Sequence, residues 1–140
     1  MPPGGWEVGH RFVYAGYDDA GALVGSVGLH LMPDAPSAFT LGYWTVESAC
    51  NRGYATLGAV ALTWVAFQLP GVSRVEVHCD AANSVSARVP RRLGFELTGT
   101  RSRALTAPGQ LGRDLVFACR RAAYPASDAH RCWVEQRCAP

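Results

Sequence analysis

Residues 41–95 constrain the fold of this chain most, because they predict four elements in a fixed order. Residues 40–46 are aromatic and β-branched and predict a strand, and residues 55–68 carry apolar side chains at helical spacing. Residues 74–78 alternate as a strand does, and residues 82–93 predict a short helix that begins at Asn83 or Ser84. This order of strands and helices indicates an α+β protein.

The flanking residues extend the predicted sheet. Arg11–Tyr17 and Leu23–Met32 surround a polar turn and predict an antiparallel hairpin, which is followed by a proline-containing loop at residues 33–37. Residues 95–101 and 114–120 predict a second antiparallel pair. Residues 122–140 show no clear periodicity, so we interpret them as a tail that packs loosely through Trp133 and Val134.

Pro90 conflicts with the predicted short helix at residues 82–93. A proline in a helix interior removes a backbone hydrogen bond and kinks or shortens the helix. If Pro90 instead lies in the first turn, the helix begins near Val89, and the preceding residues take a different geometry.

The composition predicts one domain. A chain of 140 residues that is 49% hydrophobic can build one adequate core, for which we expect residues 1–121 with a tail at 122–140. Its 13 basic and 11 acidic residues are dispersed, which disfavours a nucleic-acid partner. The sequence has neither a long apolar run nor the apolar core of a secretory signal, so we expect a cytoplasmic protein without a membrane segment.

The cysteines indicate free thiols rather than a disulfide framework, because their number is odd and their spacing irregular. They are Cys50, Cys79, Cys119, Cys132 and Cys138. The group formed by His130, Cys132 and Cys138 lacks the paired spacing of a structural zinc site, so no metal is expected there.

The turn before the longer helix has the properties of an anion-binding site. Residues 52–56 lie where unpaired helix N-terminal amides and the helix dipole favour a phosphate. Gly53 lets the backbone approach closely, Ala55 is small, and Thr56 adds a hydroxyl donor. A single glycine at such a place more often serves only the turn, so this feature alone favours a structural role.

The segments GYWTV, RGYAT, RVEVHCDAANSVSARV and RRLGF, taken together, resemble the GCN5-related N-acetyltransferase (GNAT) superfamily, and most of all its ribosomal-protein N-terminal acetyltransferase branch. The resemblance implies a mixed, mostly antiparallel sheet with helices on both faces and acetyl-CoA as cosubstrate. Family members usually carry a strand and two helices before the hairpin, so the resemblance also implies an N-terminally truncated domain. The exposed sheet edge would then invite pairing with another chain, such as a homodimer.

The resemblance also implies which residues hold the cofactor. The pyrophosphate motif falls on residues 50–55, with Cys50 where the family usually has Gln or Arg. The preceding strand would contact the pantetheine arm, and Asn83 and Ser86 match an Asn-x-x-Ser motif near the sulfur, although either residue could simply cap its helix. The expected cofactor-binding residues are Trp44, Thr45, Val46, Asn51, Arg52, Gly53, Tyr54, Ala55, Thr56, Asn83 and Ser86.

Acetyl transfer to an amine needs a base, a donor to the thioester carbonyl and an acid for the departing sulfur. A backbone N–H near Val46 would serve as the donor. Where many family members have an acid tyrosine this chain has Val89 and Pro90, which leaves Ser86 as the acid. Glu47 and Glu76 are the candidate bases, although such carboxylates are more often only solvated; we expect Ser86 and Glu47 to be catalytic.

The predicted function is therefore an acyl-CoA N-acyltransferase that transfers acetyl from acetyl-CoA to a primary amine of a protein N-terminus or a small molecule. The alternative is a catalytically impaired family member that acts as a CoA-binding or partner module. A nucleotide-binding α/β protein is disfavoured, because the turn is neither G-x-G-x-x-G nor G-x-x-x-x-G-K-[ST].

Overall fold

Strands with alternating side chains form a six-stranded sheet in the computed structural model, which describes residues 11–138. The strand order is β1-β2-β3-β4-β6-β5, and every neighbouring pair is antiparallel except β3 and β4, which are parallel. The predicted mixed, mostly antiparallel sheet is confirmed. The strands are β1 (Arg11–Tyr17), β2 (Leu23–Met32), β3 (Ala35–Thr45), β4 (Arg74–Asp80), β5 (Glu96–Ser102) and β6 (Arg113–Arg120).

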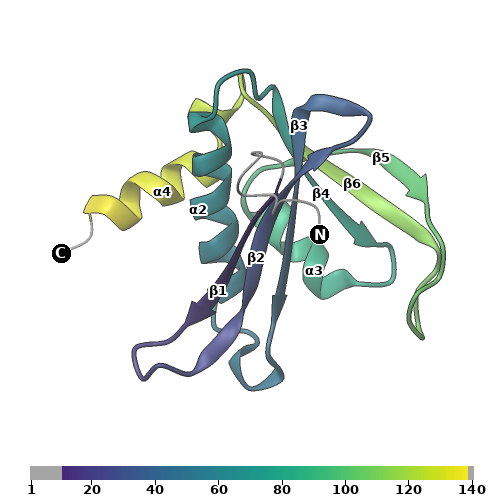
Figure 1. Ribbon diagram of the computed structural model, residues 1–140, viewed down its shortest axis with the longest axis horizontal. Coiled ribbons are helices and arrows are strands. Elements are labelled where there is room, and N and C mark those ends of the chain that lie inside the picture. Colours follow the sequence, from purple (N-terminus) through teal and green to yellow (C-terminus); the bar gives the residue numbers. More distant parts are fainter. Residues whose placement is uncertain (1–10, 139–140) are drawn as a thin grey trace, which may run out of the picture.

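Three helices accompany the sheet (Figure 1). They are α2 (Tyr54–Gln68), α3 (Ser84–Arg92) and α4 (Asp128–Cys138), with short 3-10 turns η1 (Glu47–Ala49) and η2 (Tyr124–Ala126). We expected helices on both faces of the sheet, but all three described helices contribute to a single core cluster. The α+β class is confirmed, while the described helices share one face.

The side chains of β4 explain this one-sided arrangement. Val75, Val77 and Cys79 point to the helices and are buried in the core cluster. Glu76 and the other alternate residues of β4 point to the opposite face and are polar. Only one face of β4 therefore offers an apolar surface on which a helix can pack; the opposite face is referred to below as the polar face.

Helix α3 retains Pro90 close to its C-terminal end. The helix begins after the N-cap Asn83, whose Oδ1 accepts a hydrogen bond from the backbone N–H of Ser86 at 3.0 Å, so the helix does not start near Val89. Pro90 has no N–H to donate to the Ser86 carbonyl four residues earlier. The hydroxyl of Tyr43 on β3 donates to that carbonyl instead, at 2.7 Å.

The expected loose tail is wrong for the described residues that follow η2, because they form α4 and pack against α2. Ala129 is fully buried, and Trp133 stacks on Trp64 with ring centroids 4.6 Å apart. Ala129, Cys132 and Trp133 follow one another at the i, i+3, i+4 spacing of a helix face, a signal that the sequence already contained. Val134 is exposed.

Arg121 connects the end of β6 to α2. Its guanidinium donates to the carbonyls of Phe67, Leu69 and Val72 at 3.0, 2.9 and 2.6 Å. The last carbonyls of a helix have no intrahelical donor, so a guanidinium at this position satisfies them. Its positive charge also interacts favourably with the negative end of the helix dipole. The C-terminal end of α2 is thus held by a residue that directly follows β6.

Candidate active site

The parallel strands β3 and β4 separate at one end of the sheet. Their pairing covers only three positions, the last of which joins Thr40 to Glu76. Beyond it, β3 continues to Thr45 alongside β2, while β4 continues to Asp80 alongside β6. A V-shaped opening therefore forms between the two central strands, with α2 and α3 beside it.

A pocket of about 410 Å³ connects this opening to the start of α2. Most of the expected cofactor-binding residues line it, but Val46 and Arg52 do not. Glu47 does not line it either, and lies exposed on η1. The expected residues in the lining are Trp44, Thr45, Asn51, Gly53, Tyr54, Ala55, Thr56, Asn83 and Ser86.

The turn before α2 is open to a ligand. Gly53 has φ of 84° and Asn51 has φ of 61°, both in the left-handed region that permits a sharp entry into the helix. Gly53 makes no side-chain cap, and the first turn of α2 contains no acidic residue. The backbone N–H groups at the start of α2 therefore have no side-chain acceptor at the N-cap, and the phosphate site stays a prediction.

Arginines surround this turn. Arg52 lies over the ring of Tyr54, 5.2 Å from its centroid, and is not in the pocket lining. Arg88 and Arg92, one helical turn apart on α3, line the pocket from the opposite side. Neither is among the residues expected from the sequence, although their i, i+4 spacing places them on one helix face. Their charge suits a diphosphate group.

Asn83 and Ser86 both lie at the pocket. Asn83 uses its Oδ1 to cap α3, so the capping interpretation is correct, and the same residue also lines the pocket. Val89 lines it where many family members have a tyrosine. The phenol of Tyr43, which is not among the expected site residues, extends from β3 to α3. Burial raises the pKa of Tyr43, so the hydroxyl stays protonated and is a permanent donor.

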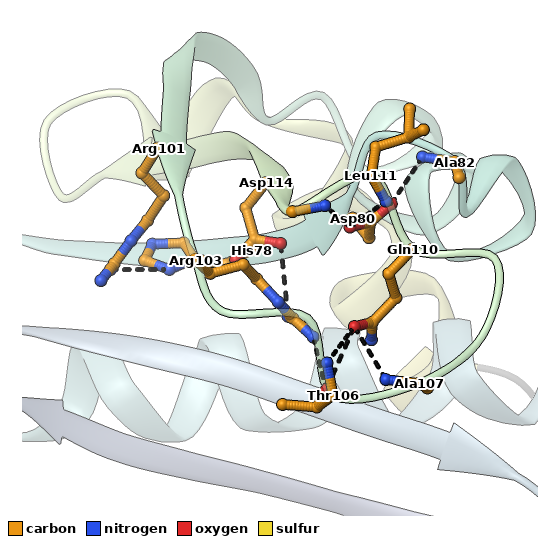
Figure 2. Close-up of polar contacts among 11 residues, drawn as sticks. His78, Asp80, Ala82, Arg101, Arg103, Thr106, Ala107, Gln110, Leu111 and Asp114 are labelled. Carbon is orange, nitrogen blue, oxygen red and sulfur yellow. Dashed lines mark hydrogen bonds and ion pairs between the residues drawn. The ribbon is translucent and has the colours of Figure 1, made fainter.

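The polar face carries a chain of hydrogen-bonded polar and charged side chains at the point where the strands separate. Glu76 accepts hydrogen bonds from Arg74 Nε at 2.6 Å and from His78 Nε2 at 2.7 Å. Figure 2 shows Arg101 beside His78, where its guanidinium approaches Nδ1 at 3.3 Å. Because a guanidinium can only donate, His78 accepts at Nδ1 and carries its proton on Nε2.

Glu76 is ionised in this arrangement. Burial alone would raise the pKa of its carboxyl group, but the hydrogen bonds from His78 and Arg74 outweigh burial and lower the pKa. A carboxylate that is stabilised in its charged form is a weak base.

Asp80 fixes the loop between β5 and β6 to the end of β4 (Figure 2). Its carboxylate accepts from the backbone N–H groups of Ala82, Leu111 and Gly112 at 2.9, 3.0 and 3.2 Å. These hydrogen bonds, chiefly those from Ala82 and Leu111, lower the pKa of Asp80. The loop is thus held close to the open end of β4.

The free thiols were predicted correctly for Cys50, Cys79, Cys119 and Cys132. The side chain of Cys138 lies outside the described residues. Among residues 11–138, no helix is long and apolar enough to cross a bilayer.

Comparisons with known proteins agree with this fold. RimL, a ribosomal L7/L12 α-N-protein acetyltransferase, has a TM-score of 0.71 at 22% identity, covering 83% of this chain and 73% of RimL. RimJ from Mycobacterium smegmatis, in complex with CoA-disulfide, has a TM-score of 0.75 at 25% identity, covering 95% of this chain and 64% of RimJ. A comparison with curated proteins found no match.

The spermidine/spermine N-acetyltransferase SpeG from Vibrio cholerae also has this fold, with a TM-score of 0.70 at 13% identity, covering 83% of this chain and 70% of SpeG. This chain therefore spans 64% to 73% of the length of the three proteins. The acetyltransferase (GNAT) domain family matches residues 4–96. Because this match covers more than half of its residues, the chain belongs to the GNAT acetyltransferase family.

Proposed function

We propose that this domain is an acetyl-CoA-dependent N-acetyltransferase that acts on a primary amine of a protein N-terminus or a small molecule. The observation that carries the proposal is the pocket that joins the start of α2 to the opening between β3 and β4. A ligand with an anionic diphosphate and a long polar arm fits this shape. Coenzyme A complexes of RimL and RimJ support the choice of ligand.

The residues present suit each part of acetyl-CoA. The backbone from Gly53 to Thr56 and the cations Arg88 and Arg92 would hold the phosphates. The backbone of β3 near Thr45, which has separated from β4, would pair with the amides of the pantetheine arm. The thioester would then lie near Ser86, close to the base of the opening.

The amine acceptor would approach from the polar face. The buried carboxylates of Glu76 and Asp114 lie on this face. Direct attack requires the amine to lose a proton, and the proposed base is Glu47. The exposed position of Glu47 requires an intervening water molecule for this role. Glu76 is the competing base, but the hydrogen bonds that it accepts from Arg74 and His78 reduce its basicity.

A catalytically impaired CoA-binding module is the second candidate. Two observations favour it: Val89 replaces the usual acid tyrosine, and Glu47 lies outside the pocket lining. Such a module would bind acetyl-CoA through the same turn and have no turnover.

Isothermal titration with acetyl-CoA, followed by thiol-release assays on amines and N-terminal peptides, separates these functions. The enzyme should bind and release thiol, and Ser86→Ala should lower kcat. Glu47→Gln and Glu76→Gln are matched variants that identify the base. The variant in which kcat/KM no longer rises with pH is the one that lacks the base. Binding without turnover favours the impaired module, and an absence of binding rejects both functions.

A further inference from the structure

Tyr43 bridges the opening at which the thioester is proposed to lie. It stands three residues beyond Thr40, the last β3 residue that pairs with β4. Its hydroxyl reaches α3 and donates to the Ser86 carbonyl at 2.7 Å. Tyr43 and Ser86 line the same pocket as Gly53, so the phenol and the phosphate-binding turn face one ligand space.

Pro90 explains why the phenol is held at this point. The Ser86 carbonyl would normally accept from the backbone N–H of residue 90, which proline lacks. This carbonyl is therefore open to Tyr43, which fixes the hydroxyl between β3 and α3. A phenolic hydroxyl can rotate about its C–O bond, so a stronger acceptor that enters the pocket can compete for its proton.

We propose that Tyr43 is a catalytic residue of the transfer reaction, whose hydroxyl donates a hydrogen bond to the sulfur of the departing CoA thiolate. This inference rests on the proposed function. Val89 on α3 stands where many family members have an acid tyrosine and cannot donate a hydrogen bond to sulfur. Tyr43 would provide such a donor from β3.

The negative charge that develops during acetyl transfer ends on the sulfur of CoA. The amine nitrogen forms a bond to the thioester carbonyl carbon, the carbon–sulfur bond breaks, and its electron pair goes to sulfur. Nitrogen loses one proton to the base, and sulfur takes up one proton that the Ser86 hydroxyl passes on from solvent, which gives an amide and a thiol. The anionic sulfur is a stronger acceptor than the neutral Ser86 carbonyl, so the hydroxyl turns toward it.

The phenol stabilises the thiolate without giving up its proton. A free phenol has a pKa of about 10 and a thiol about 8.5, so proton transfer from phenol to thiolate is unfavourable even in water. Burial raises the pKa of Tyr43 further. Tyr43 thus acts as a fixed hydrogen-bond donor, and its contribution should not change across the working pH range.

Four proteins separate this role from the structural hydrogen bond: the wild type, Tyr43→Phe, Pro90→Ala and the double variant. Tyr43→Phe removes the donor to sulfur and also leaves the Ser86 carbonyl unpaired. Pro90→Ala restores a backbone N–H for that carbonyl, so the double variant repairs the structural loss alone. We expect the double variant to recover the thermal stability of Pro90→Ala.

We expect kcat to remain about 10- to 100-fold lower in both proteins that lack the hydroxyl, as for the loss of one hydrogen bond to a charged group. The dissociation constant of acetyl-CoA, measured by titration, should change by no more than about twofold. The hydrogen bond to sulfur forms only as negative charge develops during the reaction, so its loss does not weaken binding of the substrate. The ratio of kcat between Pro90→Ala and the double variant should be constant from about pH 6 to 9, because the phenol stays protonated.

Recovery of kcat together with stability in the double variant would show that Tyr43 is only structural and would overturn the proposal. A ratio that falls toward one at alkaline pH would also overturn it, because that pattern belongs to an acid that titrates. If Tyr43→Phe does not fold, the Pro90→Ala pair still gives both readouts. If the wild type binds acetyl-CoA but acetylates no amine, the proposed function fails and this inference fails with it.

Discussion

Replacing Gly53 with alanine tests whether the turn before α2 is a phosphate site. Gly53 has φ of 84°, where an added β-carbon costs roughly 1 kcal/mol in free energy of unfolding. A β-carbon built there meets no protein atom within 4 Å, so the cost is conformational and not a clash. For a chain of this size, about 1 kcal/mol corresponds to a fall in Tm of roughly 3–5 °C.

Gly71 provides a matched control. Its φ is 79°, a β-carbon there also meets nothing within 4 Å, and it follows the end of α2, outside the pocket lining. Gly71→Ala should therefore lose the same stability as Gly53→Ala. Only Gly53→Ala should also lose acetyl-CoA affinity, by at least about tenfold or 1.4 kcal/mol, because its methyl group would occupy space that the phosphate needs.

Thermal denaturation and isothermal titration of both variants provide the two measurements. Equal affinities in Gly53→Ala and Gly71→Ala would refute the placement of the phosphates at this turn. A Tm that falls much further in Gly53→Ala than in Gly71→Ala would refute the conformational origin of the cost.

Three further predictions concern stability, each measured by urea denaturation. Arg121→Gln should cost about 2–3 kcal/mol, because the α2 carbonyls lose a charged donor; a change under about 0.5 kcal/mol contradicts the capping role. Trp133→Ala should cost about 2 kcal/mol through the lost stacking on Trp64, with weaker helical circular dichroism if α4 detaches. Glu76 has a lowered folded-state pKa, so its stabilisation is complete above the ordinary value of 4.5 and is lost as pH falls through the folded pKa; Glu76→Gln should flatten this acid dependence, and an unchanged profile would be the contrary result.

The sequence predicted the regular elements well where local pattern determines them. The hairpin strands β1 and β2 have the predicted bounds, because side-chain alternation and a polar turn are local signals. β3 begins earlier than predicted and includes Pro36. The register with β2 shifts between Leu31 and Met32, which places Pro36 in an irregular segment that needs no N–H donor from it.

The site was predictable in part for the same reason. Gly53, Tyr54, Ala55 and Thr56 are consecutive, so a local motif reveals the turn and the helix start. Tyr43 and Arg88 became candidates only when the fold brought β3 and α3 to one pocket. Contacts between residues that are far apart in sequence, such as the hydrogen bond from the Tyr43 hydroxyl to the Ser86 carbonyl, cannot be deduced from spacing.

The contact between Arg121 and α2 has a consequence for synthesis of the chain. The family match ends at residue 96, yet β4 pairs with β6 over seven positions and α2 is capped from residue 121. A nascent chain that stops at residue 96 would have the proposed phosphate-binding turn, but its β4 would pair with no strand other than β3, over three positions. We therefore expect coenzyme binding to begin only after β6 has left the ribosome, and the exposed edge of β4 to be a place where chaperones act before then.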